Sequence, residues 1–215
     1  MWQFVQARRD LFFLLSLLGV ILLYPLLDHG NVQRLVLGGL MFVPLLLATV
    51  RLAQIKDWGR PAALLMAGAV LSAALSIFFP FPILVGLKWA ILAVFFAMCA
   101  IGLFSYLRNA HNIGDSHLYT AVSIYLLLGL QWFALYSAID VIRPQSIQHS
   151  TSAAADRHAE LLYFSLVTLS TVGYGDVVPL KGEVRMLAAL EGLTGVLYIA
   201  ITVALIVSAY GPRAK

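Results

Sequence analysis

Charged residues are scarce in this sequence. Only 11% of its 215 residues are Asp, Glu, Lys or Arg, whereas 61% are hydrophobic and the mean hydropathy is +0.91. A soluble domain of this length carries about 25% charged residues. We therefore expect a membrane protein with no second, water-soluble domain. The net charge of +4 comes from basic residues near the ends of apolar segments, which indicates membrane topology and no nucleic-acid partner.

Cysteine is almost absent as well. Cys99 is the only one and lies within an apolar run, which excludes a disulfide within the chain and leaves the redox compartment open. The apolar segments also lack any cluster of nucleophile, acid–base pair or metal ligands. We therefore expect neither enzymatic activity nor a cofactor.

Long apolar runs are what the sequence has in abundance, and a run of about 20 residues can cross a bilayer. The expected spans are residues 11–27, 35–53, 62–79, 83–107, 118–142 and 184–209. Pro44 predicts a kink in the second of these. Residues 159–169 are helical in pattern but only about 16 Å long, so they predict a re-entrant helix. The fold class is therefore all-α membrane protein, with residues 143–157 expected as an exposed polar loop.

The most informative stretch is TVGYGD, residues 171–176, between the short apolar helix and the last span. Gly173 and Gly175 allow backbone dihedrals that a residue with a Cβ disfavours. This freedom would let successive carbonyls point in one direction, with the hydroxyl of Thr171 below them. Such a column of oxygens can replace the water shell of a dehydrated cation.

The TVGYG string resembles the filter of the potassium-channel pore-domain family, and we call residues 171–176 the filter segment. Residues 118–209 also follow this family's order of outer helix, pore helix, filter and inner helix. The resemblance implies a pore domain over residues 118–215 and a homotetramer around a central pore, with K⁺ as the permeant ion and no other cofactor. The ion-binding residues would be Thr171, Val172, Gly173, Tyr174 and Gly175, with K⁺ held at the first four.

The same resemblance implies a set of residues that support the filter. These residues are Tyr163, Phe164, Val167, Ser170 and Asp176. The family's commoner aromatic pair is two tryptophans, so Tyr163 and Phe164 are a departure, although Tyr163 could still hydrogen-bond Asp176. Some members carry a glutamate where Val167 stands, which excludes that acid–acid brace here.

Four residues of the last span are expected at the gate or cavity. They are Gly195, Val196, Ile199 and Val203. Gly195 matches a hinge glycine of the family, but a glycine in a membrane helix is equally often a packing residue. The other three are apolar, so an inner gate would work by narrowing and dewetting.

Three titratable residues each have two interpretations. Glu191 could be a protonatable, pH-sensitive brace near the pore helix, or could lie near the outer surface, where water or Arg185 satisfies it; we favour the second. His149 and His158 could form a pH sensor or metal site, or could be solvated loop residues, which we again favour.

Residues 1–117 resemble a voltage-sensor bundle in helix count but lack gating charges. The fourth span carries no charge between Lys88 and Arg108, and spans one to three show no buried acidic partner. We therefore expect no steep voltage dependence. Basic residues are only slightly more numerous on the side of the termini, eight against six. That orientation places the filter toward the outer face, as the family resemblance implies, so we expect a multi-pass protein of the cell membrane with both termini cytoplasmic.

The function that these features predict is passive, potassium-selective conduction across the membrane, with membrane lipids as the other partners. Three alternatives stay open. A potassium transporter subunit usually carries four degraded pore loops in one chain, whereas this chain has one intact filter. A membrane enzyme or receptor would need a chemical constellation that the spans lack. A non-conducting or regulatory channel subunit would keep the same filter.

Overall fold

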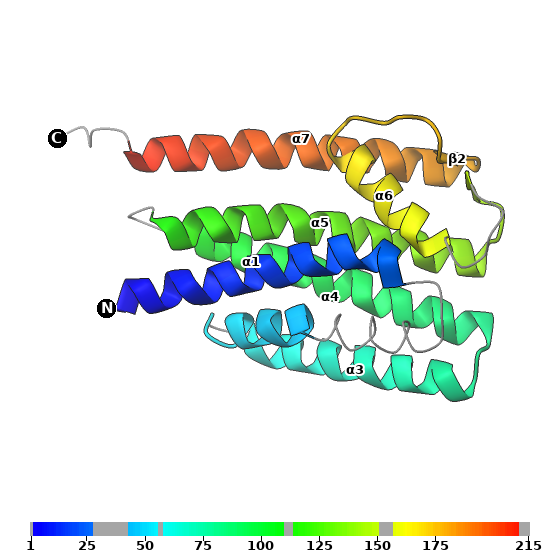
Figure 1. The fold of residues 1–215 in the computed structure, drawn as a ribbon, viewed down its shortest axis with the longest axis horizontal. Helices are drawn as coiled ribbons and strands as arrows, with labels where there is room; N and C mark the ends of the chain where they lie inside the picture. Colours follow the sequence, from blue (N-terminus) through cyan, green and yellow to red (C-terminus); the bar gives the residue numbers. More distant parts are fainter. Residues whose placement is uncertain (1, 28–42, 56–57, 110–113, 151–156, 211–215) are drawn as a thin grey trace.

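The computed structural model describes residues 2–27, 43–55, 58–109, 114–150 and 157–210. These residues are almost entirely helical. The helices are α1 (Trp2–Leu27), a short helix (Val43–Leu52), α3 (Gly59–Phe78), α4 (Pro82–Arg108), α5 (Asp115–Ile142), α6 (Arg157–Leu169) and α7 (Gly182–Tyr210) (Figure 1). The only strands in this part of the chain are β1 (Ile147–Gln148) and β2 (Val178–Pro179). The expected all-α class is therefore confirmed.

Four of the described helices, α3, α4, α5 and α7, are long and apolar enough to cross a membrane. The first expected span lies within α1, which begins nine residues earlier, at Trp2. Of the second expected span only residues 43–53 are described, and Pro44 is the second residue of that short helix, so the predicted kink is untested. The expected short helix 159–169 is α6, which begins two residues earlier, at Arg157.

Local sequence explains where these helices begin. Pro82 occupies the first turn of α4, where its missing N–H leaves no hydrogen bond unmade, and the preceding Phe81 is extended. Helix α5 begins after Gly114, whose N–H donates to Nδ1 of His117 over 3.2 Å. Asp115 adds a negative charge at the positive end of the α5 dipole.

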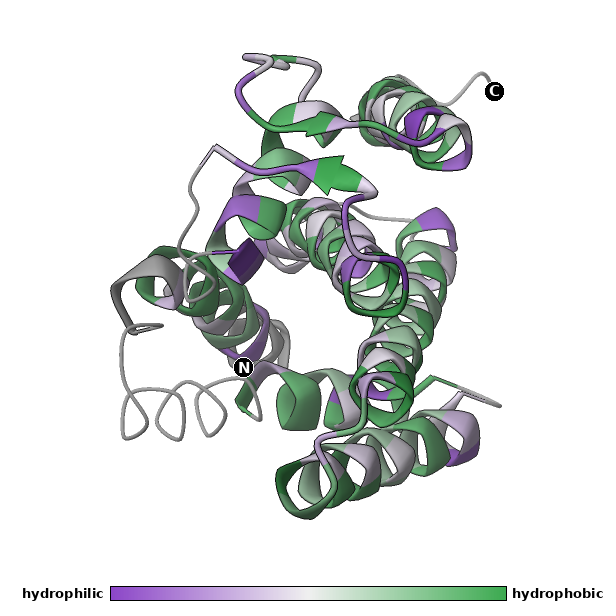
Figure 2. Ribbon diagram, turned by 90° about the vertical axis from the view of Figure 1, so that its right-hand side faces the viewer, coloured by the Kyte–Doolittle hydropathy of each residue, from purple (hydrophilic) through white to green (hydrophobic). Residues whose placement is uncertain are grey.

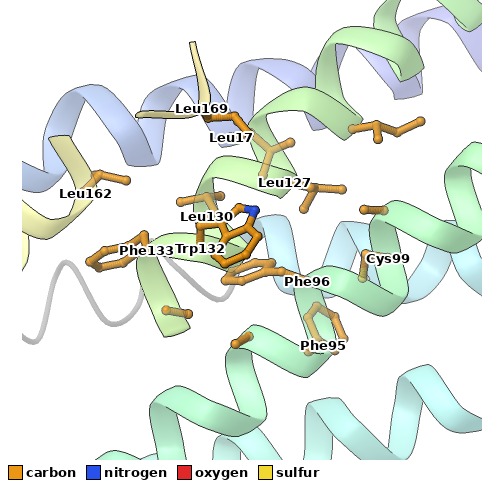
Figure 3. Packing of buried hydrophobic residues seen from close by; sticks show 14 of the residues in the cluster. Leu17, Phe95, Phe96, Cys99, Leu127, Leu130, Trp132, Phe133, Leu162 and Leu169 are labelled. Carbon is orange, nitrogen blue, oxygen red and sulfur yellow. The ribbon is translucent and has the colours of Figure 1, made fainter. Parts of the chain in front are cut away.

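The core lies where α4 and α5 pack along their length, with α1 on α5 and α3 on the outer side of α4 (Figures 1 and 3). Phe133 of α5 is a buried member of this core. The Phe133 ring makes edge contacts with Tyr24 at 5.4 Å and Trp89 at 5.2 Å between centroids. By contrast, α3 and α7 are mostly exposed: only 17% of the residues in the apolar stretch of each helix are buried. Seen along the bundle, the helices are largely hydrophobic in colour and polar residues concentrate in the connecting segments (Figure 2).

A buried polar network crosses the first helices, where the sequence predicted no buried acid. Asp10 of α1 is 2% exposed and pairs with Arg51 over 2.7 Å. Ser116 of α5 also donates to the Asp10 carboxylate, and the Arg51 guanidinium lies 5.4 Å from the centroid of the Tyr106 ring. The expectation of no buried acidic partner in spans one to three is wrong. Helix α1 begins at Trp2, before the expected start at residue 11, and so it includes Asp10, which is buried in the bundle.

Residues 151–156 of the expected exposed loop lie outside the described residues, and residues 143–150 include the short strand β1. Antiparallel pairing of β1 with β2 sets Ile147 opposite Pro179 and Gln148 opposite Val178. Ile147 is 2% exposed, and the neighbouring Ser146 carbonyl accepts a hydrogen bond from the Leu180 N–H over 2.8 Å. The start of α1 and the end of α7 lie at one end of the bundle, whereas α6 and the two strands lie at the other (Figure 1).

Candidate functional site

The filter segment follows directly from the end of α6, so the packing of α6 determines where the filter segment lies. One side of α6 is buried against α5, through Leu161, Leu162, Phe164, Ser165 and Leu169. The two helices approach closely at Gly129, where a Cβ would lie 2.8 Å from Cδ2 of Leu166. Glycine at this position therefore lets α6 lie directly on α5.

The filter backbone alternates between two conformations. Thr171, Gly173 and Gly175 have positive φ angles of 60°, 52° and 81°. Val172 and Tyr174, which lie between them, do not have positive φ. Gly173 and Gly175 adopt these angles without the steric cost that a Cβ adds, whereas Thr171, which carries a branched Cβ, bears that cost.

Backbone hydrogen bonds tie the amide side of the filter segment to α6. The N–H groups of Val172 and Gly173 both donate to the Val167 carbonyl, over 2.9 and 3.2 Å, and the Thr171 N–H donates to the Thr168 carbonyl over 3.0 Å. Among the described residues, no backbone N–H donates to the carbonyls of residues 171–174. These oxygens are therefore available to a ligand that accepts electron pairs, such as a cation.

The filter segment is exposed on the surface of this single chain. Val172 is 52% and Tyr174 72% exposed. A hollow of about 510 Å³ lies between the filter segment and α7, and Thr168, Thr171, Gly173, Ala188, Ala189, Gly192, Leu193 and Val196 line it. Irregular backbone at membrane depth must be enclosed by protein or line a water-filled cavity. One copy of the chain does not provide that enclosure.

The two aromatic residues expected behind the filter face different neighbours. The Tyr163 ring stacks on Tyr174, with centroids 6.3 Å apart, and its hydroxyl hydrogen-bonds Asp176. Desolvation, followed by the hydrogen bond and charge of Asp176, raises the pKa of the Tyr163 hydroxyl, so it stays protonated and can donate at neutral pH. Phe164 instead points toward α5, where its ring contacts Tyr136 with 5.1 Å between the centroids.

The other expected support residues act through their backbone or within α6. Val167 contributes the carbonyl that accepts from the two filter amides. The Ser170 hydroxyl is exposed and donates back to the Leu166 carbonyl over 2.7 Å, so it closes the last turn of α6. Asp176 also accepts a hydrogen bond from the Val177 N–H over 3.1 Å.

Comparison with known proteins identifies this region. Residues 120–211 match a family described as ion channel. Three similar proteins are a putative potassium channel protein of Rhodopseudomonas palustris, the two-pore potassium channel 1 of Arabidopsis thaliana and the human A-type voltage-gated potassium channel KCND3. Residues 120–211 are therefore similar to a region of ion channels, potassium channels among them.

These similarities cover a minority of each protein. In the order given above, the identities are 41% over 51 residues, 36% over 78 residues and 31% over 93 residues. These aligned segments make up 24%, 36% and 42% of this chain. They cover 12%, 19% and 14% of the respective relatives, so the chain spans less than a fifth of the length of each. No solved structure matches the chain significantly.

Within the pore domain, Glu191 lies far from the place that we favoured. Its side chain is 0% exposed and sits between α5, α6 and α7. Its two oxygens lie 2.7 Å from the Tyr136 hydroxyl and 2.7 Å from the Ser165 hydroxyl. The interpretation with water or Arg185 as its partner is wrong, because the turn of α7 directs Glu191 toward α6 and away from the outer surface. Nothing in the apolar sequence of α7 reveals that direction.

Gly195 of the pore domain is a site of close helix packing. A Cβ there would lie 3.0 Å from the Leu169 carbonyl carbon and closer still to its oxygen, at the end of α6. The cavity residues expected beside it, Val196, Ile199 and Val203, are 51%, 50% and 53% exposed on α7. The hollow beside the filter segment reaches Val196 and neither of the other two.

Both histidines near the filter end of the pore domain have partners in the structure. The His149 side chain is 10% exposed, with its ring nitrogens 2.9 Å from a Glu160 oxygen and 3.4 Å from an Asp140 oxygen. The His158 ring contacts Trp89 edge-on at 5.0 Å. The solvated interpretation is therefore wrong for His149, because α5 and α6 bring one carboxylate to each side of it. In the described part of the chain, no group of three or more His, Cys, Asp or Glu side chains is arranged so that it could hold a metal ion.

Proposed function

We propose that this chain is the subunit of a homotetrameric channel that conducts K⁺ passively and selectively across the cell membrane. The observation that carries the proposal is the filter backbone, with its amides bonded to α6 and the carbonyl oxygens of residues 171–174 left without backbone donors. A dehydrated K⁺ would exchange its water for these oxygens and for the Thr171 hydroxyl. Ions would then move between successive sites and leave by knock-on.

The exposure of the filter segment supports assembly around a central axis. In one subunit the filter segment and most of α7 face outward, and the pore needs oxygens from several sides. A ring of four chains would cover this surface and enclose the filter as a membrane requires. The Val196, Ile199 and Val203 face of α7 would then line the inner cavity, where its apolar side chains favour gating by dewetting.

The proposed topology has six spans. Four of them are α3, α4, α5 and α7, which are long and apolar enough to cross a membrane, and the other two are α1 and the expected span 35–53, which contains the short helix Val43–Leu52. The start of α1 and the end of α7 lie at the end of the bundle opposite the filter segment (Figure 1). With the filter toward the outer face, both termini are cytoplasmic, in agreement with the distribution of basic residues.

The channel proposed here is not voltage-gated, although one similar protein carries that name. Residues 89–107 of α4 contain no charged side chain, and Lys88 at the start of α4 lies 4.7 Å from the Trp89 ring centroid. Moving one elementary charge through 100 mV supplies only about 2.3 kcal/mol, so steep gating needs several charges per subunit.

Potassium flux into liposomes tests the proposal. Purified protein should carry K⁺ but not Na⁺, and Gly173→Ala should abolish selective flux because Gly173 has a φ of 52° that costs an alanine roughly 1–2 kcal/mol. Gly182→Ala is the matched control, because a Cβ there meets nothing within 4 Å and the residue lacks positive φ. Equal K⁺ and Na⁺ flux would contradict selectivity. An absence of flux from folded tetramers would favour a non-conducting subunit or a transporter subunit.

A further inference from the structure

Three short oxygen–oxygen contacts meet around Glu191, at the junction of α5, α6 and α7. Glu191 Oε2 lies 2.7 Å from the Tyr136 hydroxyl, and Oε1 lies 2.7 Å from the Ser165 hydroxyl. The Ser165 hydroxyl also lies 2.7 Å from the Gly129 carbonyl oxygen. All three distances are those of an ordinary O–H···O hydrogen bond, for which each contact needs its own hydrogen.

The hydrogens available to these contacts can be counted. Tyr136 and Ser165 supply one each, a backbone carbonyl supplies none and an ionised carboxylate supplies none. With Glu191 ionised, only two hydrogens are available for three contacts. The single Ser165 hydrogen then points either to the Gly129 carbonyl or to the Glu191 carboxylate, and the other oxygen faces the Ser165 oxygen with no hydrogen between them. With Glu191 protonated, every contact has one: Tyr136 donates to Oε2, Oε1 donates to Ser165 and Ser165 donates to Gly129.

The surroundings of Glu191 agree with this count. The carboxyl is fully buried, and none of the ion pairs in the described residues includes it. The groups that face it are the hydroxyls of Tyr136 from α5 and Ser165 from α6, with the Tyr125 phenol of α5 nearby. A buried carboxylate without a cation is strongly disfavoured, whereas a neutral acid with a full set of hydrogen bonds is not.

We propose that Glu191 is a neutral carboxylic acid that donates a hydrogen bond to Ser165 and thereby positions α6 behind the filter. The chain of hydrogens runs from α5 through the Glu191 carboxyl on α7 to α6 and back to α5 at Gly129. Glu191 touches no ion in this arrangement, so it is a positioning residue. Its role in conduction rests on the proposed function, whereas its protonation state does not.

Infrared spectroscopy of the protein in liposomes at neutral pH tests the protonation state. The wild-type spectrum minus that of Glu191→Gln should contain the C=O stretch of a protonated carboxyl. The matched control is Glu183→Gln on the same helix, because Glu183 is 61% exposed and pairs with Arg143 over 2.7 Å. Its difference spectrum should contain carboxylate bands and the amide bands of the new glutamine, but no protonated carboxyl band.

Two further variants separate positioning from simple packing. Glutamine keeps the pattern, since its amide can donate to Ser165 and accept from Tyr136, so Glu191→Gln should melt near the wild-type temperature while Glu191→Ala melts lower. Tyr136→Phe removes the donor to Oε2, so the protonated carboxyl band should move to higher frequency. This shift is measured without altering Glu191 itself.

Either of two results would overturn the inference. One is a wild-type spectrum without a protonated carboxyl band, or with such a band that neither Tyr136→Phe nor Glu191→Gln changes. The other is a Glu191→Gln variant that loses as much melting temperature as Glu191→Ala. Neither measurement requires ion conduction, so a failure here is distinguishable from the absence of K⁺ flux, which would count against the proposed function alone.

Discussion

Replacing Gly195 with alanine should destabilise the pore domain, because one added methyl group has no room. The Cβ would lie 3.0 Å from the Leu169 carbonyl carbon and 3.2 Å from its Cδ1, with the carbonyl oxygen nearer than either. Two of these three atoms are backbone, so no side-chain rotation relieves the overlap. Helix α7 must therefore move away from the end of α6, and the filter segment begins two residues after Leu169.

The size of the effect follows from two opposing terms. Overpacking a well-packed site costs about 1–3 kcal/mol, and a backbone clash belongs at the upper end of that range. Alanine in place of a helical glycine recovers roughly 1 kcal/mol of helix propensity. We therefore expect Gly195→Ala to lose roughly 2 kcal/mol of stability.

Gly192→Ala is the matched control for this prediction, three residues earlier on the same helix. Its Cβ would lie 3.5 Å from the Thr168 carbonyl oxygen, which is an ordinary van der Waals contact. We expect Gly192→Ala to be neutral or more stable by up to about 1 kcal/mol. Thermal melts of both variants in detergent, followed by circular dichroism, measure the difference.

Equal melting temperatures for the two glycine variants would refute the close packing described at Gly195. A hinge role makes a different prediction. If Gly195 serves only as a hinge and is not closely packed, Gly195→Ala should keep its melting temperature and change only the ion flux, because alanine limits bending. Loss of stability in Gly195→Ala alone supports packing against α6.

Three further predictions concern the rest of the subunit. Asp10→Asn or Arg51→Met alone should lower the free energy of unfolding by about 3–5 kcal/mol, because each leaves a buried charged partner uncompensated. The double variant should lose less than the sum of the two, and additive losses in a double-mutant cycle of thermal melts would contradict the pairing. His149→Ala should cost about 1–3 kcal/mol by leaving the carboxylates of Asp140 and Glu160 without their shared partner, and an unchanged melt would count against that bridge. Current–voltage recordings should show no steep gating, so a Boltzmann slope of several elementary charges would contradict the uncharged α4.

The backbone-level features of the pore domain could be predicted from the sequence because small residues and segment lengths specify them. The alternation of Gly173 and Gly175 with larger residues indicates special dihedrals, and both glycines have positive φ. The short apolar helix follows from its pattern, and α6 differs from the expected 159–169 by two residues at its start, whereas its re-entrant position in the membrane stays a prediction. Whether the filter selects K⁺ stays a prediction that flux must test.

The neighbours of each helix face could not be predicted, because helices that are apolar all round carry no amphipathic pattern. Glu191 meets Tyr136 across 55 residues and Ser165 across 26, and no local signal links these positions. His149 was placed in solvent because the surrounding segment is polar, yet the ends of α5 and α6 converge on it. Asp10 was placed outside the membrane bundle by a helix boundary drawn nine residues too late.

The contacts of Phe133 have a consequence for protein engineering. This residue belongs to the region that is similar to ion channels, yet its ring lies between Tyr24 of α1 and Trp89 of α4, outside that region. Helix α5 thus packs both on α6 and α7 and on the preceding helices α1 and α4. A chimera that replaces residues 118–215 with the corresponding region of a known channel would need an aromatic residue at the position of Phe133 to keep these contacts. The boundary between residues 117 and 118 therefore divides the sequence but not the core.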